Sequence, residues 1–301
     1  MRPKRGVDAT GLALGFGAYG LWGLFPPFFT ALDPAGAGEI TAHRIIWTFV
    51  FIGALLVASG RLGELRAIRP RTWLLLACAS ALISVNWLIY VSAVNTGHAV
   101  DAAFGYFINP LVSVLFGVVI FGERLNRAQV VALAIALSAV LLLAAGISGP
   151  PLISLGLAVS FALYGAVKKV IPADPRVSVG VESALAAPFA AGYLLWLQIG
   201  GLAHFAGHGA VHAALLLLCG PVTAIPLLLF AAAAQRLALV TLGVLQYLTP
   251  SMLMAWGVFV AREPMSGAHW AGFALIWTAL AVFSVDALSR ARRGKGTLLA
   301  S

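Results

Sequence analysis

The sequence predicts an all-α integral membrane protein with ten transmembrane helices arranged as two inverted five-helix repeats. The composition is the first observation: 61% of the 301 residues are hydrophobic and only 10% are charged, whereas soluble domains carry about 25% charged residues. So few polar side chains do not cover a surface that faces water. Ten apolar segments of membrane-spanning length and an internal repeat are the other two observations.

Each apolar segment holds about 18–24 residues, enough at 1.5 Å per residue to cross a hydrocarbon core of about 30 Å. The first segment follows Arg2, Lys4 and Arg5, as in a signal peptide, but it is long enough to span and no polar domain follows it. The expected limits are 10–30, 40–59, 72–95, 101–122, 127–146, 152–170, 177–199, 211–234, 238–260 and 267–285.

The two halves of the chain repeat each other. The stretch GLALGFGAYG at 11–20 returns as GLAVSFALYG at 156–165, which pairs Tyr19 with Tyr164. Five spans per copy, an odd number, place the second copy upside down, and inverted repeats are typical of transporters. The predicted domains are residues 1–146, residues 147–288 and a basic tail at 289–301. A second match pairs Pro110, Gly117, Val118 and Glu123 with Pro250, Gly257, Val258 and Glu263.

The positions of the basic residues predict the orientation of the chain. With both termini in the cytoplasm, 17 of the 19 Lys and Arg residues fall in cytoplasmic segments, Arg262 lies outside and Arg44 lies within a span. This bias follows the positive-inside rule and accounts for the formal charge of +9 without nucleic acid as a partner. We expect a multi-pass protein of the bacterial cytoplasmic membrane.

Two prolines hold equivalent places in spans four and nine. Pro110 and Pro250 each remove one helical hydrogen bond and free the carbonyl four residues earlier, at Tyr106 and Gln246. A single proline is tolerated in a membrane helix as a packing kink. The symmetric pair and its polar neighbours favour two helix breaks that line a cavity. The predicted substrate contacts here are Tyr106, Asn109, Gln246, Tyr247 and Thr249.

Polar residues inside other spans are a second signal, because a charge at the bilayer centre costs several kcal/mol. Asn86 and Tyr90 share one helix face and join the predicted cavity. His43, Arg44 and Glu182 are candidates for charge recognition, gating or proton coupling. Each has a plainer interpretation: His43 as a hydrogen-bonding residue between helices, Arg44 as a side chain that reaches the outer interface, and Glu182 as an anchor at the inner interface.

Aromatic and small residues extend the candidate site. Tyr19 and Tyr164 continue the repeated segments, whose paired small residues at 11, 15, 156 and 160 favour close helix packing. Trp22, Trp47 and Trp87 suit either stacking on a substrate or the aromatic belt at the membrane interface. Cys78 and Cys219 lie in apolar segments as small hydrophobic residues. Because no enzyme, nucleotide-binding or metal motif is present, we expect no enzymatic activity, no cofactor and no metal.

Several strings resemble the EamA family of the drug/metabolite transporter superfamily, and within it the RarD branch. They are TAHRIIW at 41–47, NWLIY at 86–90, GYFINPL at 105–111 and TAIPLL at 223–228. The resemblance runs from about residue 8 to 288. One departure is Arg262-Glu263-Pro264, where the first half has Gly122-Glu123-Arg124. The resemblance implies a cavity between spans 1–4 and 6–9 that carries small metabolites or drugs across the membrane, and the branch name carries an association with chloramphenicol.

The residues and the resemblance together predict a secondary transporter that works by alternating access, with efflux as the expected direction. The alternatives are a passive facilitator or channel, an intramembrane enzyme, and a membrane scaffold without transport. The expected partners are a small-molecule substrate and the lipid bilayer. Proton coupling and a homodimer are left open, as is the identity of the substrate.

Overall fold

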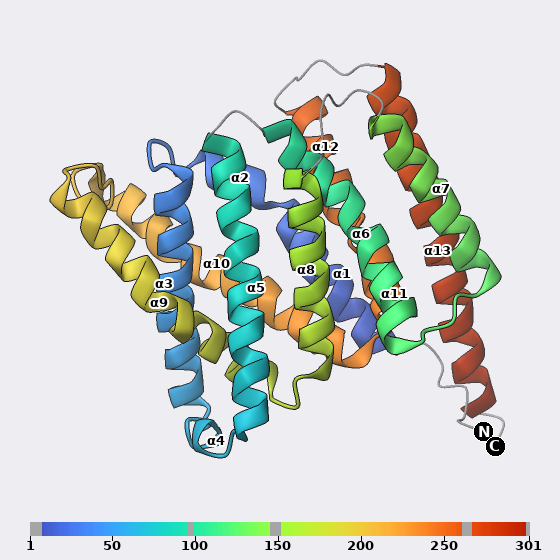
Figure 1. Cartoon of the computed structure of the whole chain (residues 1–301), viewed down its shortest axis with the longest axis horizontal. Coiled ribbons are helices and arrows are strands. Elements are labelled where there is room, and N and C mark those ends of the chain that lie inside the picture. Colours follow the sequence, from blue (N-terminus) through green and yellow to red (C-terminus); the bar gives the residue numbers. More distant parts are fainter. Residues whose placement is uncertain (1–7, 96–98, 145–151, 261–266, 299–301) are drawn as a thin grey trace.

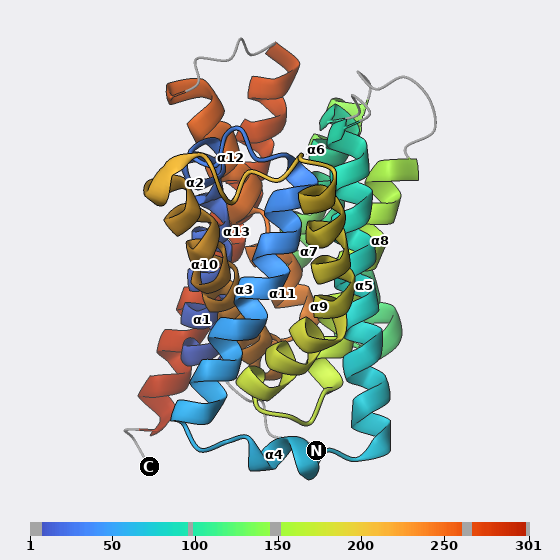
Figure 2. The same ribbon diagram turned by 90° about the vertical axis from the view of Figure 1, so that its left-hand side faces the viewer.

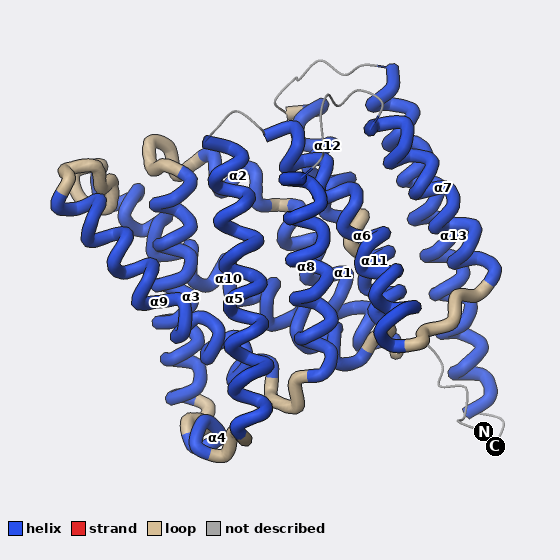
Figure 3. Tube along the Cα trace, in the orientation of Figure 1, coloured by secondary structure: helices blue, strands red, loops and turns tan. Residues whose placement is uncertain are grey.

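The computed structural model describes residues 8–95, 99–144, 152–260 and 267–298, and these residues form helices and loops without a strand (Figure 3). The helices lie in one bundle (Figure 1). Their bounds are α1 Ala9–Gly23, α2 Phe25–Thr30, α3 Ala37–Ala58, α4 Gly63–Arg66, α5 Pro70–Asn95, α6 Ala99–Phe121, α7 Arg127–Ala144, α8 Leu152–Val170, α9 Pro175–Ile199, α10 Gly209–Arg236, α11 Leu239–Leu245, α12 Leu248–Phe259 and α13 Gly267–Leu298.

Among the described residues, eight segments are long and apolar enough to cross a membrane, from α1–α2 through α10 with the short α4 left out. The all-helical membrane fold is therefore confirmed. The ninth expected span is divided into α11 and α12, and the tenth corresponds to α13, whose apolar stretch is Trp270–Asp286. The arrangement as ten spans in two inverted repeats stays a prediction.

Helix boundaries differ from the expected limits in three places. The first span is divided after Gly23, where Pro26 lies in the first turn of α2. The ninth is divided at Gln246 and Tyr247. The third difference is at the end of the tenth span, where α13 continues past residue 285 to Leu298. The basic tail at 289–301 stays a prediction. Arg262 and Glu263 lie outside the described residues.

Close helix contacts use small residues. A Cβ atom added at Gly11 or Gly15 would come 2.8 Å from Leu237 and Leu245, respectively, so these glycines let α1 approach α10 and α11. The strongest packing pairs are α6 with α8, α7 with α13, α3 with α9, α3 with α10, α1 with α10, α5 with α8, and α6 with α11. Figure 2 shows α3 and α9 on the face toward the viewer.

Two ends of the bundle serve as reference points. The α4 end holds α4 and the α8–α9 loop, and the α2 end holds α2 and the α9–α10 loop (Figure 1). Between them, large apolar side chains such as Phe189, Leu88 and Leu195 are 60–82% exposed, as expected where lipid replaces water. The largest core cluster joins α1, α3, α8 and α10, and it places Tyr19, Tyr164 and Phe230 at the centre of the bundle.

Candidate functional site

Arg44 lies in α3, near the α2 end, among aromatic side chains from two other helices. Its guanidinium carbon is 4.8 Å from the ring centre of Trp87, 5.5 Å from that of Phe29 and 5.7 Å from that of Phe25. Its Nε donates a 3.0 Å hydrogen bond to Thr223 Oγ1 on α10. No carboxylate in the described part of the chain forms an ion pair with Arg44.

Glu182 lies in α9 on the α4 side of the bundle, where three donors satisfy its carboxylate. Lys168 Nζ lies 2.6 Å from Oε1, Ser178 Oγ lies 2.7 Å from the same oxygen, and the Tyr164 hydroxyl donates to Oε2 at 3.1 Å. The Lys168 and Glu182 side chains are only 1% and 6% exposed. The pair is therefore a buried ion pair that joins α8 to α9, and both carboxylate oxygens accept hydrogen bonds.

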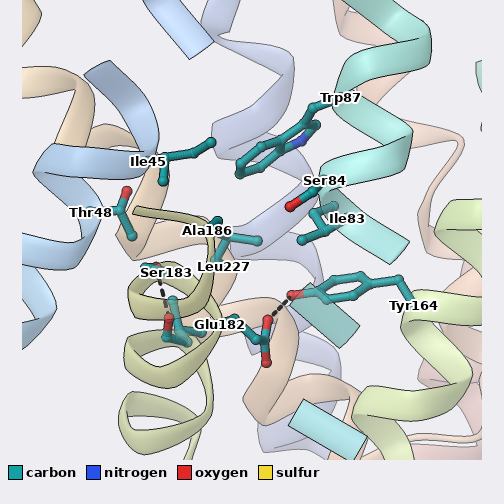
Figure 4. Close-up of a pocket in the computed structure, with 11 residues that line it drawn as sticks. Ile45, Thr48, Ile83, Ser84, Trp87, Tyr164, Glu182, Ser183, Ala186 and Leu227 are labelled. Carbon is teal, nitrogen blue, oxygen red and sulfur yellow. Dashed lines mark hydrogen bonds between the residues drawn. The ribbon is translucent and has the colours of Figure 1, made fainter. Parts of the chain in front are cut away.

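A small cavity separates these two charged groups. Its volume is about 20 Å³, room for a single water molecule. Figure 4 shows Trp87 on one side of the cavity, and Tyr164 with Glu182 on the other. Since Trp87 also contacts Arg44, the cavity lies between the Arg44 group and the Glu182 group. Its lining comes from α3, α5, α8, α9 and α10, through Ile45, Thr48, Ile83, Ser84, Trp87, Tyr164, Val179, Glu182, Ser183, Ala186 and Leu227.

Most of the sequence-predicted contacts lie outside this cavity. The rings of Tyr90 and Tyr106 contact each other at 6.0 Å, which joins α5 to α6. Asn86 uses its Nδ2 for two 2.9 Å hydrogen bonds to α8, one to the Leu157 carbonyl and one to Ser160 Oγ. Asn86 therefore has an evident structural contact, and its predicted role in substrate contact stays a prediction.

The residues around the two repeat prolines form a second polar group, between α6 and the α11–α12 break. Ser113 Oγ donates to Gln246 Oε1 at 3.3 Å, and Thr249 Oγ1 donates to the Tyr19 carbonyl at 2.8 Å. Two buried atoms here have no hydrogen-bond partner, Asn109 Oδ1 and the Tyr247 hydroxyl. Unpaired polar atoms in an apolar interior cost about 1–3 kcal/mol each.

The repeat prolines are not equivalent in the structure. Pro250 lies in the first turn of α12, where a missing N–H breaks no helical hydrogen bond, so the helix break falls before it. Pro110 lies inside α6, which continues on both sides of it, so the expected break in span four is not seen. A Cβ atom at Gly243 would lie 2.9 Å from the Pro110 carbonyl oxygen, which shows how closely α11 approaches α6 here.

Tyr19 and Tyr164 meet at one ring. Tyr164 stacks on Phe230 at 5.7 Å with an interplanar angle of 11°, and Tyr19 packs edge-on against the same ring at 6.1 Å. Tyr19 therefore contributes to the packed core, whereas Tyr164 belongs to both the core and the cavity wall.

His43 belongs to a polar cluster at the α2 end. Glu39 accepts hydrogen bonds from the backbone N–H of His204 at 2.6 Å and pairs with its ring Nδ1 at 2.7 Å. The His43 ring stacks on Phe205 at 5.3 Å, and its Nδ1 accepts from Trp47 at 3.1 Å, while its Nε2 is buried without a hydrogen bond. Glu39 thus holds the α9–α10 loop against α3.

Two contacts fix the α4 end. Glu123 accepts from the N–H groups of Leu239 and Val240, both at 2.8 Å, and so caps the N-terminus of α11. Asp174 caps α9 and pairs with Arg61. Hydrogen bonds from Arg176 hold the pKa of the Asp174 carboxyl below its usual range, and the charge of Arg61 acts in the same direction.

Three residues of these groups escaped the sequence reasoning. Lys168 was counted among the basic residues that set the orientation, although the spacing of four from Tyr164 already puts both on one face of α8. Glu39 lies in the first turn of a span, where an acidic residue usually interacts with the helix dipole. Thr223 had no signal beyond its place in the TAIPLL string. Within the described residues, no group of His, Cys, Asp or Glu is arranged to hold a metal ion.

Comparison with known proteins gives this membrane fold its class. Residues 9–145 match the EamA-like transporter family. Protein RarD of Streptomyces exfoliatus is 49% identical over 294 residues, which cover 97% of this chain and 93% of that protein. The uncharacterized transporter YojE of Bacillus subtilis is 40% identical over 304 residues and 97% of each chain. A solved crystal structure has the same fold, with a TM-score of 0.71, 22% identity, and coverage of 92% of this chain and 98% of that one.

The fold and the relatives define a multi-pass membrane protein of a transporter class. The chain belongs to the EamA-like transporter family and groups with proteins named RarD. The resemblance drawn from the sequence strings is confirmed.

Proposed function

We propose that the chain is a secondary transporter that exports a small metabolite or drug across the bacterial cytoplasmic membrane by alternating access. The observation that carries the proposal is the cavity between Arg44 and the Lys168–Glu182 pair. Helices of both predicted repeats line it, α3 and α5 from the first and α8, α9 and α10 from the second. Transporter sites commonly lie where two such repeats meet.

The packing pattern supports the ten-span, inverted-repeat reading. Three of the strongest contacts pair a span with its own repeat counterpart: α3 with α9, α6 with α11, and α7 with α13. Two others are related by the repeat, because α1 corresponds to α8 and α10 corresponds to α5. The contact of α1 with α10 in this way corresponds to the contact of α8 with α5. A two-fold axis between the repeats produces this pattern. In the proposed orientation the α4 end and both termini face the cytoplasm.

Two features support a second conformation. A cavity of about 20 Å³ is far smaller than the roughly 300–1,000 Å³ typical of sites for small organic molecules, so the bundle must open to take a substrate. Asn109 Oδ1 and the Tyr247 hydroxyl are buried without partners. A rearrangement at the α11–α12 break, or a bound substrate, would give these two atoms hydrogen-bond partners. That would remove the free-energy cost of leaving them unpaired.

Counterflow in proteoliposomes tests this function, with substrates taken from a metabolite profile of cells with and without the protein. We expect trans-substrate to accelerate uptake, and the Asn109→Ala and Gln246→Ala variants to transport more slowly at equal reconstitution. Normal rates in both variants would remove these two residues from the proposed site. Flux without trans-acceleration would instead indicate a passive facilitator. Comparison with and without a pH gradient tests whether protons are coupled, with His43 and Glu182 as the candidate carriers.

A further inference from the structure

Arg44 lies within the bundle but has no counter-charge among the described residues. Lys168, the other cation deep in the bundle, pairs with Glu182 at 2.6 Å and donates a second 2.6 Å hydrogen bond to Ser178. Arg44 has no such counter-charge in the described chain, and its one polar contact is the neutral hydroxyl of Thr223. A cation held at membrane depth without an anion is costly, so its retention points to a function.

The guanidinium group is fixed so that part of it is left unused. Nε donates to Thr223, and no acceptor for the N–H groups of the two terminal nitrogens is found among the described residues. Neither of these unpaired nitrogens is fully enclosed by protein atoms, and the Arg44 residue is partly exposed. A guanidinium fork with unused donors matches the two oxygens of a carboxylate.

The surroundings of Arg44 suit an organic anion better than a hydrated ion. The rings of Trp87, Phe25 and Phe29 lie 4.8–5.7 Å from the guanidinium carbon. Aromatic rings offer stacking area to the apolar part of a ligand, while they give a small inorganic ion little to replace its water.

The position of Arg44 also argues against a side chain that only reaches for the membrane surface. Its side chain contacts Thr223 on α10 and Trp87 on α5, both on helices that pack against α3. Trp87 is itself a wall of the cavity (Figure 4). The Arg44 group is therefore one residue layer from the space that the proposed transport cycle opens.

From these contacts we propose that Arg44 binds the carboxylate of the transported molecule, so that the substrate class is a small organic anion with an apolar or aromatic body. This inference rests on the proposed function. Trp87 and Thr223 act as positioning residues: Thr223 fixes the orientation of the guanidinium, and Trp87 covers one of its sides.

A thermal-stability assay on the purified full-length protein in detergent tests the inference with three matched probes, benzoate, benzamide and benzylammonium. We expect benzoate to raise the Tm in a saturable manner and the neutral and cationic analogues to leave it unchanged. Arg44→Gln should abolish the effect, and Arg44→Lys should weaken benzoate binding at least about tenfold, because a point charge replaces the fork. Arg236→Gln, at an exposed arginine that pairs with Asp8, should bind as the natural chain does.

Benzoate and benzamide with equal effects, no effect of benzoate, or a full effect in Arg44→Gln would each overturn the inference. If Arg44→Gln does not elute as a monodisperse protein, Thr223→Val replaces it. We then expect weaker benzoate binding, while benzoate still raises the Tm more than benzamide or benzylammonium does. Counterflow separates the two proposals. Trans-acceleration of a neutral or cationic substrate only would contradict the inference and leave the transporter standing, while no trans-acceleration of any substrate would contradict the proposed function.

Discussion

The ammonium group of Lys168 lies 2.6 Å from Glu182 Oε1, and both side chains are almost fully buried. The contact joins α8 to α9 on the α4 side of the cavity, with Ser178 and Tyr164 as further donors to the carboxylate. In the proposed cycle this network keeps the α4 side closed, and it must separate when the cavity opens toward that side.

Removal of one partner leaves the other as an uncompensated buried charge. We expect Glu182→Leu to destabilise the protein by about 3–5 kcal/mol, and the double variant Lys168→Met/Glu182→Leu to recover most of that loss. Tm measurements on the purified variants provide the comparison. Glu64→Ala, which removes a half-exposed partner of Arg61, is the control and should change stability by less than about 1 kcal/mol. A double variant no more stable than Glu182→Leu would contradict this account of the pair.

Glu123 caps α11 through two backbone N–H groups. We expect Glu123→Ala to lower stability by about 1–2 kcal/mol, the usual range for loss of a helix cap, and Glu123→Gln to lose less because its amide oxygen still accepts one bond. Hydrogen exchange at Leu239 and Val240 reports the effect locally. Unchanged exchange there in Glu123→Ala would show that the cap does not hold the helix start.

Gly220 marks the closest approach of α10 to α3. A Cβ atom at Gly220 would overlap the backbone carbonyl of Trp47, whereas one at Gly53 would meet no atom within 4 Å. We therefore expect Gly220→Ala to lower the yield of folded protein severely. Gly53→Ala should be neutral or slightly stabilising, since alanine favours helix by about 1 kcal/mol over glycine. Equal yields of monodisperse protein from the two variants would contradict this packing.

Asn86 and Tyr90 share a face of α5 but differ in their contacts. Asn86→Leu removes two hydrogen bonds to α8 and leaves the Leu157 carbonyl and Ser160 without that donor, so we expect a loss of about 1–3 kcal/mol. Tyr90→Phe keeps the ring contact with Tyr106 and should keep its Tm, while it weakens substrate affinity in counterflow. The opposite assignment, a stable Asn86→Leu and an unstable Tyr90→Phe, would reverse the two roles.

Hydrophobic runs and loop spacing allowed the spans to be placed within a few residues, because a bilayer-length apolar segment has few alternatives to a helix. The break before Pro250 was also within reach, since proline is tolerated in the first turn of a helix and so favours a helix start. Pro110 shows why the same rule did not transfer: whether a helix continues through a proline depends on its neighbours, here α8 and α11.

The sites were harder to predict than the spans. Arg44 and Glu182 stood out as charges inside apolar segments, but the partner of Glu182 did not, because Lys168 lies in the last turn of α8 beside Lys169 and follows the orientation rule. Partners across helices depend on rotation and tilt, which the hydrophobic pattern leaves open. The same holds for Thr223 at Arg44 and for Leu157 at Asn86.

Alternating access is the central claim, and reciprocal exposure of Ser84 tests it most directly. Ser84 lines the cavity, so Ser84→Cys in a variant without Cys78 and Cys219 is labelled by an impermeant maleimide from each side of oriented vesicles. Addition of Glu182→Leu alone, which leaves Lys168 as an uncompensated buried charge, weakens closure at the α4 side. The account predicts faster labelling from that side and slower labelling from the opposite side. Faster labelling from both sides, or unchanged labelling from the opposite side, would contradict it.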